Sequence, residues 1–120
     1  LMKAAEIGDY DIVQILLNAG ASINALDSKG WSSLTYAALN GSLETVSLLL
    51  SNGAIIDSFC KEGNTPLMYA AEKGHLDVVA LLLSKNAAVN IANNSGKTSL
   101  MLAASKGHLK VVESLTSSGA

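Results

Sequence analysis

Residues 63–83 read GNTPLMYAAEKGHLDVVALLL and contain the signals that begin and end a helix. Thr65 is a good N-cap, and Pro66 suits the first helical position because its missing amide hydrogen costs nothing there. Gly74 can adopt the left-handed conformation that ends a helix. An apolar stripe at helical spacing follows and predicts another helix over about residues 76–85. The stretch therefore predicts two short helices joined by a tight turn.

This pattern recurs along the whole chain with a period of 33 residues. Residues 65–87 and 98–120 share 14 identities in 23 aligned positions, far above chance. Two short helices cannot bury their apolar faces alone, so each copy needs a neighbour, and the repeat predicts a stack of helix pairs. We therefore expect one domain, residues 1–120, built from four units. Units one to four span about residues 1–26, 27–59, 60–92 and 93–120.

The composition excludes several classes of function. The chain of 120 residues has eight Lys, no Arg and ten acidic residues, so its net charge is −2 and it lacks the broad positive field of a nucleic-acid-binding protein. The longest apolar run is the six residues 78–83, which is too short to cross a membrane. We expect no nucleic-acid partner, no membrane insertion and a monomer in isolation.

The sequence predicts neither a metal site nor a catalytic site. One Cys and two His cannot supply the four ligands of a zinc site. His75 and His108 occupy the same place in adjacent units, about 10 Å apart when stacked, so we expect each imidazole to bond to backbone near a helix turn. No phosphate-binding loop or G-x-S-x-G motif is present. We therefore expect no enzyme activity and no cofactor. We interpret Cys60 as an idle surface cysteine near a hairpin tip, with a reactive thiol as the alternative.

The Thr-Pro-Leu start at residues 65–67 and the Gly-His junction at residues 74–75 resemble the ankyrin repeat. The same features recur every 33 residues, so the resemblance extends over the whole chain. It implies an all-α ankyrin-repeat solenoid of stacked helix-turn-helix units with short hairpin loops, whose first helices and hairpins line a concave side. It also implies that the chain binds another protein. The family's His after Thr-Pro-Leu is replaced by Met2, Thr35, Met68 and Met101, so its hydrogen bond to Thr cannot form here.

The two sides of such a stack differ in charge. Six Lys and four acidic residues map to the concave side, a net charge of +2, whereas two Lys and six acidic residues map to the back, a net charge of −4. The concave lysines are Lys3, Lys29, Lys61, Lys73, Lys97 and Lys106. We therefore expect a partner that presents a mildly acidic patch, because charge complementarity steers association.

Four of the five aromatic residues map to the hairpins or first helices of units two and three. Trp31 and Phe59 lie in hairpin segments with little core to fill, so we interpret them as contacts to a partner. Tyr36 and Tyr69 are equivalent positions, and they either stack on each other between units or join the same patch. The residues predicted to bind a partner are Leu26, Lys29, Trp31, Tyr36, Leu39, Phe59, Lys61, Glu62, Asn64, Tyr69, Lys73 and Lys97.

These features favour a non-enzymatic protein-interaction module that acts as a scaffold or masks the active site of a partner enzyme. The alternative is a targeting or regulatory segment of a larger enzyme or channel, which the start at Leu1 permits. Ser114 and Thr116 replace leucines of the preceding unit, so we interpret unit four as a polar cap that closes the stack. A cytoplasmic location is favoured, and a secreted or processed form stays open because the chain does not begin with Met.

Overall fold

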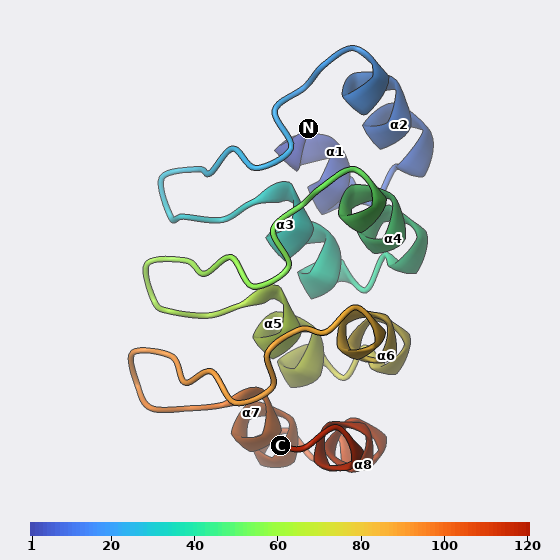
Figure 1. The fold of residues 1–120 in the computed structure, drawn as a ribbon. Helices are drawn as coiled ribbons and strands as arrows, with labels where there is room; N and C mark the ends of the chain where they lie inside the picture. The colour runs from blue at the N-terminus through green and yellow to red at the C-terminus, as the bar shows by residue number, and fades with distance from the viewer.

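The computed structural model describes residues 1–120 and contains eight helices in four pairs, with no β-strand. The first helices of the pairs are α1 (Met2–Ile7), α3 (Ser33–Asn40), α5 (Pro66–Lys73) and α7 (Ser99–Ser105), and the second helices are α2 (Tyr10–Asn18), α4 (Leu43–Ser51), α6 (Leu76–Ser84) and α8 (Leu109–Ser117). In Figure 1 the pairs stack in chain order in two layers, and the loops between units project beyond the layer of first helices. The predicted all-α solenoid is confirmed.

The helix ends of unit three lie where the sequence predicts them. The Thr65 hydroxyl caps α5 by accepting a hydrogen bond from the Met68 amide at 3.4 Å, and Pro66 is the first helical residue. Gly74 ends α5 with a φ of 75°, and Asn86 follows α6 with a φ of 66°. No helix in the chain combines the length and the apolar character that a membrane span requires.

Small residues on the first helices set the spacing of the stack. Ala37 and Ala38 of α3 and Ala70 and Ala71 of α5 are fully buried, which lets successive first helices approach closely. The second helices add the larger side chains of the core. Those fully buried on α4 and α6 are Val46, Leu49, Val78, Val79 and Leu82. Substituting a larger side chain for Ala71 would cost about 1–3 kcal/mol, because a packed core has no space for it.

Each histidine links its own unit to the preceding one. The Nε2 atom of His75 lies 2.8 Å from the carbonyl oxygen of Leu39, and Nε2 of His108 lies 2.9 Å from the carbonyl oxygen of Glu72. The predicted bonding of imidazole to backbone is confirmed, and the bond crosses the interface between units. The rings lie directly over glycines: a Cβ at Gly74 would stand 2.6 Å from Nδ1 of His108.

The interpretation of Cys60 as a surface cysteine is wrong, since its side chain is only 4% exposed. Its Sγ atom lies 3.4 Å from the hydroxyl of Tyr69. The loop of unit two covers it from the other side, because a Cβ at Gly30 would lie 3.2 Å from the Cα of Cys60. Stacking of neighbouring hairpin loops therefore buries a residue that a single unit would expose.

Unit four, interpreted from the sequence as a polar cap, exposes side chains of both kinds. Thr116 and the serines after it are exposed, whereas Ser114 is half-buried. Met101 and Leu109 are also exposed, by 54% and 68%, at the end of the stack. The last unit therefore presents apolar side chains as well as hydroxyl groups.

Candidate functional site

Three aromatic rings meet where the hairpin loop of unit two rests on α3 and α5. The Trp31 ring lies between Tyr36 of α3, at a centroid distance of 5.0 Å, and Tyr69 of α5, at 4.8 Å, with tilted ring planes in both pairs. The two tyrosines therefore contact Trp31, and no stack between Tyr36 and Tyr69 themselves is found. We call Trp31, Tyr36 and Tyr69 the aromatic cluster.

The aromatic cluster is fixed in place yet remains partly accessible. Tyr69 is buried, whereas Trp31 and Tyr36 are half-buried and present part of their rings to solvent. The Lys29 ammonium group stands 5.2 Å from the centroid of the Trp31 ring, within the range of a cation–π contact. A rigid, half-exposed Trp with a cation beside it is a surface that a partner can contact with little loss of side-chain entropy.

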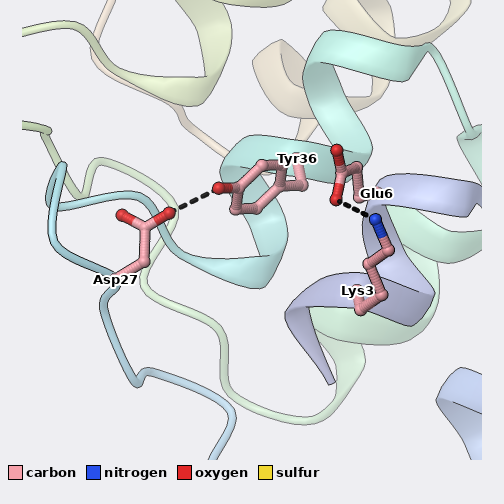
Figure 2. Close-up of polar contacts among 4 residues, drawn as sticks. All are labelled: Lys3, Glu6, Asp27 and Tyr36. Carbon is pink, nitrogen blue, oxygen red and sulfur yellow. Dashed lines mark hydrogen bonds and ion pairs between the residues drawn. The ribbon is translucent and has the colours of Figure 1, made fainter.

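Asp27 holds the loop of unit two in its shape. Its carboxylate accepts hydrogen bonds from the amides of Lys29 and Trp31, both at 2.9 Å, and a further one from the hydroxyl of Tyr36. Figure 2 shows the Tyr36 hydroxyl pointing from α3 to this carboxylate, with Glu6 and Lys3 of α1 paired at 3.4 Å nearby. These bonds join the loop, the aromatic cluster and the first helix of the same unit.

The bond between Asp27 and Tyr36 shifts the proton affinity of both groups. The Tyr36 hydrogen bond is the main cause that lowers the pKa of the Asp27 carboxyl; burial opposes it as the second cause, and the backbone amides of Trp31 and Lys29 and the charge of Lys29 lower the pKa further. The same bond, followed by burial and by the charges of Asp27 and Glu6, raises the pKa of Tyr36 to about 12. The pair is therefore an ionised carboxylate and a neutral phenol at neutral pH.

The equivalent place in unit three is held by different groups. Cys60 stands where unit two has Asp27. The hydroxyl of Tyr69 contacts the Sγ atom of Cys60 and accepts a hydrogen bond from the side-chain amide of Asn64 at 3.3 Å. Burial is the main cause that raises the pKa of Tyr69. The side-chain oxygen of Asn64 accepts a hydrogen bond from Asn93 of unit four at 2.8 Å. The loop of unit three is thus tied to α5 and to the next loop.

Backbone hydrogen bonds tie the hairpin loops to one another. The amide of Lys61 donates to the carbonyl of Lys29 at 3.1 Å, and the amide of Asn94 donates to the carbonyl of Glu62 at 3.0 Å. The Asn94 side chain adds a bond to the carbonyl of Lys61 at 2.8 Å. Lys29, Lys61 and Lys97 are therefore carried on one connected row of loops with exposed side chains.

A second feature, which we call the apolar hollow, lies between the loop segments of units one and two. It encloses about 370 Å³ and is lined by Leu26, Ile55 and Phe59 together with Asn24, Ser32, Asp57 and Ser58. The three apolar side chains are exposed, and Phe59 reaches 69%. No member of the aromatic cluster lines this hollow.

The predicted binding residues thus fall into separate groups. Lys29, Trp31, Tyr36, Asn64 and Tyr69 lie in or beside the aromatic cluster, whereas Leu26 and Phe59 line the apolar hollow. Lys61, Glu62 and Lys97 are exposed on the hairpin loops; half-buried Leu39 and exposed Lys73 lie near the ends of α3 and α5.

Two residues of the site were missed by reasoning from the sequence. Asp27 was placed at the start of a hairpin but not among the binding residues, although its spacing of nine residues from Tyr36 recurs in Cys60 and Tyr69 and could have suggested a contact. Ile55 was also overlooked; it begins a turn closed by the hydrogen bond from the Ser58 amide to its carbonyl, and its side chain is 56% exposed. The structure contains no group of His, Cys, Asp or Glu that could hold a metal ion.

Comparison with known proteins adds one finding. A family model described as ankyrin repeats (3 copies) matches residues 1–93 and, in an overlapping match, residues 60–120. The two matches together span the whole chain. No curated protein matches the sequence.

Proposed function

Because this chain belongs to the ankyrin-repeat family, we propose that it is a non-enzymatic module that binds another protein on its concave face, where the hairpin loops meet the first helices. Ankyrin repeats generally mediate protein–protein interaction, and their domains are typically not catalytic. The observation that carries the proposal for this surface is the half-exposed Trp31 held between Tyr36 and Tyr69.

The aromatic cluster has the properties of an energetic centre of binding. Trp and Tyr are enriched among the residues that dominate interfaces, and such residues are flanked by contacts that exclude water. Trp31 is already fixed by two ring contacts, so a partner that covers it loses little additional side-chain entropy. A partner side chain with an apolar surface fits this place.

The surroundings of the aromatic cluster favour an acidic partner. Lys29 stands over the Trp31 ring, and Lys61 and Lys97 extend from the neighbouring loops. Asp27 and Glu62 offset only two of these three positive charges, so the loops keep a net charge of +1. We infer a partner segment that combines an apolar side chain with acidic neighbours, bound so that the chain acts as a scaffold or masks a functional surface of the partner.

The test is affinity capture from cells of the source organism, followed by titration of the captured partner. Trp31→Ala is expected to weaken binding by about 2 kcal/mol or more, roughly 30-fold, while the helical circular dichroism signal is retained. Phe59→Ala tests whether the apolar hollow contributes to binding of the partner. The substitution should leave the packing of the chain intact, because the Phe59 ring is 69% exposed.

Lys85→Ala is the matched control, because Lys85 is exposed at the end of α6 on the opposite side of the stack. It is expected to bind as the unmodified chain does. A folded Trp31→Ala variant that binds its partner with unchanged affinity would contradict the proposed surface.

A further inference from the structure

We propose that the apolar hollow binds a protein segment in which an apolar side chain lies next to a lysine or an arginine. The apolar side chain enters the hollow, and the cationic group meets the carboxylate of Asp57. This rests on the proposed function in one respect, that the chain binds a protein, but it concerns a separate site, because no member of the aromatic cluster lines the hollow. The hollow also favours the opposite charge, since the aromatic cluster favours acidic neighbours.

The apolar walls of the hollow are particular to the junction of units one and two. Leu26, Ile55 and Phe59 line it and are 55%, 56% and 69% exposed. One period later the same places are held by Phe59, Ala88 and Ala92. With these smaller alanines no cavity forms between the loops of units two and three. The repeat therefore does not require the large side chains, and exposed apolar side chains gathered around a cavity are typical of a binding site.

The hollow has the size and the lining of a site for a large side chain. Its volume of about 370 Å³ lies near the lower end of the roughly 300–1,000 Å³ of ligand pockets. The hydroxyl oxygen of Ser32 lies 3.1 Å from that of Thr35 and 3.4 Å from that of Ser58. Asn24 accepts and donates one hydrogen bond each. An apolar side chain that enters therefore leaves none of these groups buried without a partner, which would be costly.

Asp57 gives the hollow its charge preference, since it is the only charged residue of the lining. One oxygen of its half-buried carboxylate accepts a hydrogen bond from the Ala88 amide at 3.0 Å, and the other has no partner within the chain. No buried side-chain oxygen lacks a partner, so this second oxygen is accessible to solvent. The ion pair of the chain joins Lys3 and Glu6, and no lysine pairs with Asp57. An ammonium or guanidinium group can therefore form a charge-assisted hydrogen bond here.

The neighbouring units show that the fold does not need a negative charge at this place. Asn24 and Asn90 occupy it in units one and three. The side-chain oxygen of Asn24 accepts a hydrogen bond from the Ile55 amide at 2.9 Å, as Asp57 does from an amide of unit three. The side-chain amide of Asn24 also donates to the carbonyl of Gly53 at 3.2 Å, a bond that a carboxylate cannot make. Asp57 thus lacks one structural bond and has a free charge beside the apolar walls.

The test is titration of the full nitrogen-15-labelled chain with three capped tetrapeptides, followed by the shifts of backbone amide signals in NMR spectra. The peptides are Ala-Phe-Lys-Ala, which carries both groups, Ala-Phe-Glu-Ala, which reverses the charge, and Ala-Ala-Lys-Ala, which lacks the ring. The first is expected to shift the amides of Leu26, Ile55 and Phe59 and to bind about fivefold more tightly than the second. The third should bind more weakly than the first, because it has no ring to bury.

Two variants separate the contributions of the charge and the ring. Asp57→Asn keeps an oxygen for the Ala88 amide and should bind the Lys and Glu peptides with nearly equal affinity. Phe59→Ala should weaken binding of both peptides that contain Phe. Glu113→Gln is the matched control, because it removes the same charge from an exposed place on α8 of unit four. It should bind all three peptides as the unmodified chain does.

Two results would overturn the proposal. In one, the Ala-Phe-Lys-Ala peptide leaves the amides of the hollow unshifted or binds no more tightly than its Glu counterpart. In the other, Asp57→Asn keeps the full preference for the Lys peptide. Neither result bears on the aromatic cluster, which is tested by the affinity of the captured partner for Trp31→Ala. A partner that depends on Trp31, found together with peptides that do not bind, would overturn only the assignment of the hollow.

Discussion

Replacing Gly74 with Ala tests how the units are joined. The residue has a φ of 75°, which costs a residue with a side chain about 1–2 kcal/mol. The new Cβ would also lie 2.6 Å from the His108 ring, so the ring must move away from the Glu72 carbonyl that it contacts at 2.9 Å. Losing that hydrogen bond costs about another 1 kcal/mol. We expect a total loss of about 2–3 kcal/mol in the free energy of unfolding, and more for Gly74→Val.

Two controls separate the backbone cost from the clash. Gly107 has the same φ of 75° but no atom within 4 Å of a Cβ, so Gly107→Ala should cost only the backbone part, about 1–2 kcal/mol. Gly74→Ala made in a His108→Ala background should fall to a similar value, because the ring is already gone. Urea unfolding followed by circular dichroism measures the unmodified chain and four variants: Gly74→Ala, Gly107→Ala, His108→Ala and the double variant. If Gly74→Ala cost the same with and without the His108 ring, the account of the junction would be refuted.

Two further predictions concern the aromatic cluster and its surroundings. Folding lowers the pKa of Asp27, so its carboxylate stabilises the folded chain above the unfolded pKa of about 4, and this stability is lost as the pH falls through the folded pKa. Tyr36→Phe should make the free energy of unfolding, measured in urea at several pH values, fall less at acid pH. An unchanged pH profile would contradict this. Cys60 is only 4% exposed, so a thiol reagent such as Ellman's reagent should modify it far more slowly in the native chain than in urea. Equal rates would show that the thiol is not buried in the native chain.

The sequence predicts the helices of this chain well because local chemistry decides their ends. Thr65, Pro66 and Gly74 act within a single turn, and their effect does not depend on the neighbouring units. The period of 33 residues then predicts that units stack, since an apolar stripe on each helix needs a neighbour. The hydrogen bonds of the His75 and His108 rings to backbone carbonyls are predicted for the same reason, because equivalent positions in a repeat have equivalent neighbours.

The candidate site is predicted less well because it depends on contacts between loops. Cys60 was assigned to the surface on the basis of one hairpin, whereas it is buried with Tyr69 of α5 against its Sγ atom and Gly30 of the preceding loop close to its Cα. The alternatives weighed for Tyr36 and Tyr69 did not include a Trp31 ring that reaches across from the loop to separate them. The contact between Trp31 and Tyr69 and the approach of Gly30 to Cys60 join residues of different units whose loop sequences differ, so the repeat pattern does not predict them.

The position of the aromatic cluster in the stack bears on how it could bind. Units two and three have neighbours on both sides, and in a linear stack stability is the sum of the interfaces between neighbouring units. Trp31, Tyr36 and Tyr69 therefore belong to units that are stabilised from both sides. A partner that contacts the cluster meets a surface that is already ordered, so little conformational entropy is lost when it binds.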